Sequence, residues 1–272
     1  MPFVFWLNIV LKGKLNNQFY SHFKLLVSAL RILVCDNLCQ IHNQLAETFL
    51  KEFVSQYSIL YGPHNVSYNV HNLVHLPMFV KIHGSLDNFS CFKYENYLQE
   101  IKKSIKSAKY PLPEITNRII EKQKHCLSEK YQISNPVTVG KEVSIKIVSP
   151  YVSLADKIYE KITLQDLNIT INTSKIKDKY VMLKNQNIVV VRHIMKRQNE
   201  FEFKIIVQKF FNCLNFYFSP TPSSNLETFN INTALLSDEF IISVTEVKYK
   251  CFFVPISNET AIVTTLCHGI AE

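Results

Sequence analysis

Hydrophobic residues recur every three to four positions from Asn16 to about Lys130, which is the spacing of helices with one buried face. The stretch NQFYSHFKLLVSALRILV carries one such stripe, and NLCQIHNQLAETFLKEFVSQYSILYG carries a second that ends at Gly62-Pro63. The same pattern predicts three further helices, over residues 69–81, 90–108 and 114–130.

The hydrophobic period changes after a polar segment, YQISNPVTVG (131–140), which is the predicted linker. Short runs of β-branched and aromatic residues follow, and they predict six or seven strands: LNITIN, KYVMLKN, NIVVVRHIM, EFEFKIIVQKFF, FIISV, KCFFVPI and AIVTTL. Asn185-Gln186-Asn187 is a candidate hairpin turn. We therefore expect an α+β protein, with a helical region over 1–135 and a β-rich domain over 136–272 that forms a small SH3-like barrel or sandwich.

The composition is that of a folded protein, and it limits the kinds of partner and binding loop that the chain can have. Hydrophobic residues make up 47% of the 272 residues, and 30 Lys+Arg against 22 Asp+Glu give a formal net charge of +8. This charge is compatible with nucleic acid or an anionic membrane as a partner. With only 5 glycines and no Gly-x-Gly-x-x-Gly or Gly-Lys-Ser/Thr run, nucleotide-binding loops of those types are excluded.

The location of the protein follows from its cysteines and its apolar start. Seven scattered cysteines are typical of reduced thiols, which favours the nucleus or the cytoplasm. The apolar run Pro2–Leu11 is too short to span a bilayer and follows no basic residue. We interpret it as core sequence, and we expect neither a signal peptide nor a transmembrane segment.

Two histidines four residues apart, His71 and His75, lie in the predicted helix over 69–81. That spacing suits zinc, and the pair Cys35 and Cys39 would complete four ligands. The long gap between the two pairs, and the apolar helical pattern around each, favour packed or hydrogen-bonded histidines instead.

Glu95 and the lysines after it are the second group of candidate functional residues. Glu95 stands among aromatic residues in NFSCFKYENYLQEIKK, either as a solvated helix position or as a carboxylate in a cleft, where it would need a cation or a proton. The basic residues are Lys102, Lys103, Lys106 and Lys109. Lys102, Lys106 and Lys109 are expected to share a helical face that is either solvated or lies along a phosphate backbone.

The β-rich half offers two weaker candidates. Arg192, His193, Lys196 and Arg197 fall on one predicted hairpin, where we interpret them mainly as surface charge. The aromatic run FFNCLNFYF (210–218) fits core packing better than a peptide or base pocket.

Residues from about 60 to 109 resemble the C-terminal portion of transposases from CACTA-type DNA transposons and their insect relatives. The matching pieces are SYNVHNLVHLP and HGSLDNFSCFKYENYLQEIKKSIK, which follow the family order of H-x3-H-L, a loop with Gly and Leu, and an aromatic-rich helix with a Glu before lysines. The helix over 16–34 resembles the segment that precedes this pattern. Together these pieces cover about a third of the chain.

The resemblance implies an RNase H-like core in which three acidic residues hold Mg²⁺ ions for strand cleavage and joining. By position Glu95 corresponds to the third acid and metal ligand, His71 and His75 to the motif histidines, and the lysines to DNA contacts. The four acidic residues before Glu95 lie outside strand-like sequence; they are Asp36, Glu47, Glu52 and Asp87. The two family aspartates are therefore expected to be missing, so the chain alone is not an active transposase and needs no cofactor.

Three functions follow from this reading. The leading hypothesis is a transposon-derived, catalytically inactive fragment that binds DNA non-specifically through its lysines. The alternative is a protein-interaction module in which the β-rich domain binds a protein partner. A metal-dependent hydrolase that uses His71, His75 and Glu95 is the third, and the family resemblance disfavours it because these residues already have a place in the family pattern.

Overall fold

The computed structural model describes residues 2–106, 110–129, 137–143, 150–153, 155–198 and 200–266. Contacts divide the chain into two compact units, one made of residues 1–87 with 137–272 and the other of residues 88–136. The predicted order of helices followed by strands, and with it the α+β class, is confirmed. The contact-based division differs from the expected boundary at residue 135, because the first helices pack against the β region.

Residues 2–87 of the first unit are mainly helical, and the helix that begins at Leu86 runs two residues into the second unit. In chain order the helices are α1 Pro2–Leu11, α2 Asn17–Val34, α3 Asp36–Tyr61, α4 Tyr68–Asn72, α5 Leu76–His83 and α6 Leu86–Phe89, with 3-10 turns at Pro63–Asn65 and Leu73–His75. Among the described residues, no helix combines the length and the apolar composition needed to cross a lipid bilayer.

The pairing of α2 with α3 forms the core of the helical region. Small and branched side chains meet there, and Ala29, Ile32, Ala46 and Leu50 are all inaccessible to solvent. His22 is also buried: its ring stacks on Phe53 at 4.1 Å between centroids, and its Nε2 lies 2.8 Å from the Phe53 carbonyl oxygen. This buried polar ring is satisfied by hydrogen bonding, as buried polar groups generally are.

The start of α2 is fixed by a side-chain cap. The Asn16 side-chain oxygen accepts a hydrogen bond from the Gln18 backbone N–H at 3.1 Å. We expect Asn16→Ala to lower the free energy of unfolding by about 1 kcal/mol, because a helix donor loses its partner. Asn16→Asp should retain the cap and the stability, as measured by urea denaturation. Equal loss in both variants would show that the cap is not the cause.

The second unit contains two helices, α7 Phe92–Ser104 and α8 Pro111–Glu129. They are joined by ion pairing: the Lys122 ammonium lies 2.9 Å from the Glu100 carboxylate. Glu114 of α8 also accepts a hydrogen bond from the Lys106 backbone N–H at 2.9 Å.

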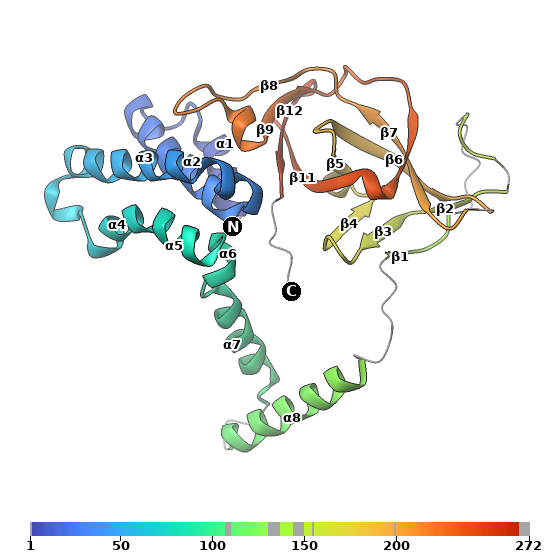
Figure 1. Ribbon diagram of the computed structural model, residues 1–272, viewed down its shortest axis with the longest axis horizontal. Coiled ribbons are helices and arrows are strands. Elements are labelled where there is room, and N and C mark those ends of the chain that lie inside the picture. The colour runs from blue at the N-terminus through green and yellow to red at the C-terminus, as the bar shows by residue number, and fades with distance from the viewer. Residues whose placement is uncertain are drawn as a thin grey trace. The chain divides into compact units, whose positions relative to one another are not determined.

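The β region contains two sheets in which all paired strands run antiparallel (Figure 1). The three-stranded sheet has the order β1-β3-β4, and the larger one has the order β10-β7-β6-β5-β11-β12-β9-β8, with β2 paired to β6. The strands are β1 Val137–Val139, β2 Lys157–Tyr159, β3 Lys161–Leu164, β4 Ile169–Asn172, β5 Tyr180–Leu183, β6 Ile188–Lys196, β7 Phe203–Lys209, β8 Cys213–Asn215, β9 Thr228–Asn232, β10 Phe240–Ser243, β11 Val247–Pro255 and β12 Thr260–Thr265.

The two central strands, β5 and β6, are buried on both faces. Val181 and Val189 belong to a cluster that also contains Ile162 and Ile171, so the three-stranded sheet packs on this face. Their neighbours Met182 and Val190 point to the opposite face and join a second cluster with residues of β9, β11 and β12. The larger sheet therefore curls over itself and encloses a core of its own.

Of the two expected forms, an SH3-like barrel or a sandwich, the barrel is wrong because the described strands of the larger sheet do not close. The described strands form an open sheet whose edge strands, β10 and β8, are not paired with each other. Irregularities in the pairing of β11 with β5, between Val247 and Tyr249, and of β6 with β7, between Val191 and His193, accompany the bending. Such bulges increase local twist, which curls the sheet without closing it.

A buried arginine joins the helices to the β region. Arg31 of α2 is 3% exposed; its Nε donates to the Leu226 carbonyl oxygen at 3.1 Å, and its guanidinium also donates to the Thr265 hydroxyl. The Glu227 carboxylate lies 3.6 Å from the same guanidinium and accepts a hydrogen bond from Thr265 at 2.5 Å. Figure 1 shows α2 beside the end of the sheet that carries β9 and β12.

Candidate nucleic-acid interface

The lysines expected to bind DNA lie at the C-terminal end of α7. Lys102, Lys103 and Lys106 are all exposed. Among the described residues, no carboxylate lies within ion-pairing distance of their ammonium groups. Lys109 lies outside the described residues. The three described lysines thus form a small basic surface, which we call the α7 lysine cluster.

The helix that carries these lysines is shorter than expected. α7 ends at Ser104, and Ile105 has extended backbone angles (φ −80°, ψ 118°). The Ser104 hydroxyl donates back to the Ile101 carbonyl oxygen, and Glu114 receives the Lys106 backbone N–H. Lys106 therefore does not continue the helical row of Lys102, and the predicted shared helical face is wrong for this pair.

Glu100 is the nearest acidic neighbour of the cluster in sequence, and it is directed toward α8. Its hydrogen bond and ion pair with Lys122 hold the pKa of the Glu100 carboxyl below its usual value, with a smaller contribution from the charge of Lys103. Because Lys122 supplies the main counter-charge to Glu100, the charges of Lys102 and Lys103 remain available to an external anion.

Glu95 occupies an exposed position in the first turn of α7. Its neighbours Tyr94 and Tyr97 are also exposed, so the side chain does not lie in an aromatic cleft. A carboxylate in the first helical turn is favourable because it faces the positive end of the helix dipole. Solvent exposure and this interaction account for a carboxylate at this position.

His71 and His75 are exposed and lie near each other, with ring centroids 5.5 Å apart. They do not share one helix, because α4 ends at Asn72 and a 3-10 turn precedes α5. Pro77 in the first turn of α5 forces this break, since proline is compatible with a helix start but not with its interior. The two rings nevertheless lie side by side as the spacing predicts, although α4, a 3-10 turn and α5 take the place of the single expected helix.

Cys35 and Cys39 do not complete a metal site with the histidines. Both thiols are buried, and the Cys39 Sγ donates to the Asp36 carbonyl oxygen at 3.3 Å. Burial raises the pKa of the Cys39 thiol, with a further contribution from the charge of Asp36. Within the described ranges, no three His, Cys, Asp or Glu side chains are grouped as metal ligands.

The aromatic run over 210–218 separates into core and surface residues. Phe210 is buried in the cluster enclosed by the curled sheet, whereas Phe211 and Phe218 are exposed. Tyr217 lies with Arg31 at the boundary of the helices and the β region, where burial raises the pKa of its hydroxyl. The expectation of core packing therefore holds for part of the run only.

The basic residues of the predicted hairpin fall on β6 and at its end. Arg192 is half-buried and donates to the Gln208 side chain, whereas Lys196 and Arg197 line an open hollow. Two further residues of this hollow, Lys157 and Tyr159, come from β2. Neither residue was predicted as part of a site, because a strand of only three residues has no hydrophobic pattern long enough to identify it.

Comparison with known proteins adds one match. A family model described as a domain of unknown function (DUF8592) matches residues 145–266, which is most of the β region. No curated protein and no solved structure matched the chain.

Proposed function

We propose that this chain is a transposase-derived fragment that binds DNA without cutting it. The observation that carries the proposal is the α7 lysine cluster, whose ammonium groups are exposed while Glu100 is paired to Lys122. Lysines placed in this way contact phosphates and carry no base-reading geometry, so the binding would be non-specific and sensitive to salt. This role would be exercised in the nucleus.

Binding is proposed rather than cleavage because of the available metal ligands. The two-metal cleavage implied by the transposase resemblance needs several carboxylates around a pair of Mg²⁺ ions. Glu95 is exposed, and the described residues contain no group of three suitable ligands. The residues present do not fit such a metal pair, and we derive no catalytic step from them.

The test is a salt series with a quadruple lysine variant. In this variant Gln replaces Lys102, Lys103, Lys106 and Lys109, and binding to duplex DNA should weaken by about tenfold or more at low salt. The slope of log Kd against the logarithm of the salt concentration should fall by about three to four, because about one unit of slope is lost with each phosphate contact. Fluorescence anisotropy with a labelled duplex measures both quantities. Circular dichroism should show unchanged helix content, because the described members are exposed.

A matched control distinguishes the effect of the α7 lysine cluster from the effect of lowering the net charge of the chain. Lys14, Lys175, Lys177 and Lys184 are also exposed, and replacing them with Gln removes the same charge. This control should bind duplex DNA nearly as the native chain does. Equal weakening by both quadruple variants would refute the assignment to α7, and Mg²⁺-dependent nicking that disappears in Glu95→Gln would refute the non-catalytic role.

A second candidate function is protein binding through the edge of the larger sheet. β8 is an edge strand that carries the exposed Leu214, and the exposed Phe211 and Phe218 lie before and after it in the chain. Exposed edge strands with apolar side chains are sites where another chain adds a strand. If β8 binds a partner chain in this way, Leu214→Lys should abolish binding of that partner, because it places a charge on the edge strand. Lys14→Gln should leave binding of the partner unchanged.

A further inference from the structure

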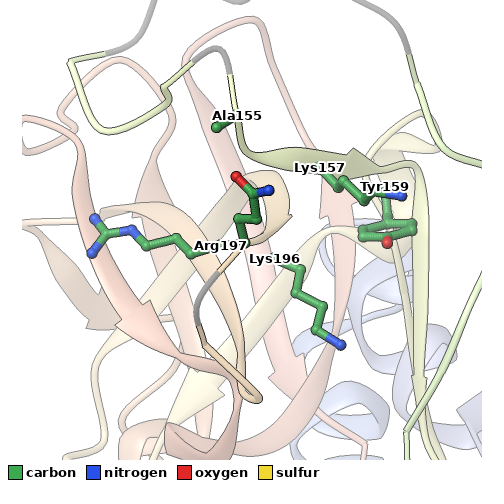
Figure 2. A pocket seen from close by; sticks show the side chains of 6 residues that line it. Ala155, Lys157, Tyr159, Lys196 and Arg197 are labelled. Atoms are coloured by element: carbon green, nitrogen blue, oxygen red, sulfur yellow. The ribbon is translucent and has the colours of Figure 1, made fainter.

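The open hollow in the β region lies where β2 pairs with the end of β6, and it belongs to a different compact unit from the α7 lysine cluster. Its volume is about 460 Å³, and it is lined by Ala155, Lys157, Tyr159, Lys196, Arg197 and Gln198. Figure 2 shows Lys157 and Tyr159 on β2, the Lys196 side chain extending from the neighbouring strand in a different direction, and Arg197 extending to the other side. All six residues lie within the stretch that matches the domain family.

Two lysines of the hollow are direct neighbours across the sheet. Lys157 of β2 is the register partner of Lys196 of β6. Like charges directly opposite each other on paired strands are destabilising, so the pair has an unfavourable interaction that a bound anion would relieve. A phosphate bound over this pair would accept charge-assisted hydrogen bonds from both lysines once their flexible side chains turn toward it.

The nearby carboxylates only partly neutralise these cations. Glu142 lies 3.5 Å from the Lys157 ammonium, and Glu200 lies 3.3 Å from the Arg197 guanidinium. Glu200 is also 2.6 Å from Lys204, so one carboxylate serves two cations. Among the described residues no carboxylate is within ion-pairing distance of Lys196, whose ammonium lies 5.2 Å from the centre of the Phe203 ring.

An aromatic wall accompanies the cations. The Tyr159 ring lines the hollow, and Phe203 supports it edge-to-face, with the ring centroids 5.8 Å apart and the planes at 71°. Both residues pack against the core between the two sheets, which fixes the position of the Tyr159 ring. A fixed aromatic ring beside a pair of cations matches a nucleotide, which presents a planar base and a phosphate together.

We propose that this hollow binds one nucleotide unit of a single-stranded nucleic acid, with the phosphate bound by Lys157 and Lys196 and the base against Tyr159. The volume is in the range of small-ligand sites. A single strand is the expected form, because a base inside a duplex stays stacked on its neighbours and does not present its face to a protein ring. The site goes beyond the proposed duplex contact and lies in the other compact unit.

The experiment uses the full chain carrying the quadruple α7 lysine substitution, so that duplex binding by α7 does not contribute. Binding of a fluorescein-labelled oligothymidylate is followed by anisotropy. Lys157→Gln with Lys196→Gln should weaken it by about tenfold, because two charge-assisted contacts to one phosphate are removed. Glu142→Gln should strengthen it by about threefold, because a competing carboxylate is neutralised.

The control and the competitors distinguish the sources of binding. Lys175→Gln with Lys177→Gln removes the same charge from exposed positions and should leave the affinity unchanged. Thymidine monophosphate should displace the oligonucleotide at lower concentration than inorganic phosphate does. Equal weakening by both double variants, no gain from Glu142→Gln, or equal competition by phosphate would each overturn the proposal. These outcomes are independent of the duplex test, which reports on α7 alone.

Discussion

Replacing Arg31 with methionine is expected to lower the free energy of unfolding by about 3 kcal/mol or more, because it leaves the Glu227 carboxylate without its cation in a largely buried site. The substitution also leaves the Leu226 carbonyl oxygen and the Thr265 hydroxyl without the hydrogen bonds that Arg31 donates. Urea denaturation followed by circular dichroism measures the change. Methionine retains most of the side-chain volume, so the effect reports on charge and hydrogen bonding more than on packing.

Two further variants test the reason for the loss. Arg31→Met combined with Glu227→Gln should recover about 1 to 2 kcal/mol, because the carboxylate that has lost Arg31 is replaced by a neutral amide that still accepts from Thr265. Arg118→Met breaks an exposed pair with Glu121 and should change the stability little, because solvent screens such a pair. A loss in Arg31→Met no larger than that in Arg118→Met would show that the junction contributes little.

Ile171→Ala is expected to lower the free energy of unfolding by about 2 to 5 kcal/mol, as large-to-small substitutions in cores do. Ile171 belongs to β4 of the three-stranded sheet, is inaccessible to solvent, and shares a cluster with Val181 and Val189 of the larger sheet. The substitution therefore measures how strongly the two sheets hold each other. Urea denaturation gives the value.

The matched control is Ile176→Ala, because Ile176 is 63% exposed and lies in the turn that follows β4. This variant should change the stability by no more than about 0.5 kcal/mol. A similar small change in Ile171→Ala would mean that the three-stranded sheet does not depend on its packing against β5 and β6.

The long amphipathic helices and the longest apolar strands could be predicted from the sequence. α2 and α3 each carry a sustained stripe at helical spacing, and their observed bounds, Asn17–Val34 and Asp36–Tyr61, agree closely with those expected. β6 and β7 follow continuous runs of branched and aromatic residues. In these elements the pattern is long enough to outweigh individual exceptions.

Short and polar strands were not predicted, for a physical reason. β1, β2 and β8 have three residues each, and β9 reads TFNIN, with two asparagines in five positions. Such strands are stabilised by pairing with distant neighbours and not by their own composition. The curl of the larger sheet was missed for the same reason, because strand order and register depend on contacts that local spacing does not encode.

The candidate sites divide in a similar way. The sequence correctly placed Lys102 and Lys103 on a helix, but it extended that helix past Ser104, because nothing in the spacing showed that Glu114 would receive the Lys106 backbone N–H. Arg31 was not among the candidate residues. Its partners lie about two hundred positions away, and the local sequence pattern carries no sign of them. The β2–β6 hollow required a strand that the pattern did not reveal.

The contact between Arg31 and Thr265 has a consequence for synthesis of the chain, because the two residues are 234 positions apart. At translation rates of about 5 to 20 residues per second, Arg31 leaves the ribosome on the order of ten to fifty seconds before Thr265 does. For most of that time α2 has neither Glu227 nor Thr265 to bind, because Glu227 precedes Thr265 by only 38 positions, and the residues of the intervening unit emerge in between. The helices made first therefore cannot complete their contacts until β12 has been synthesised, so the larger unit completes its folding only after Thr265 has left the ribosome.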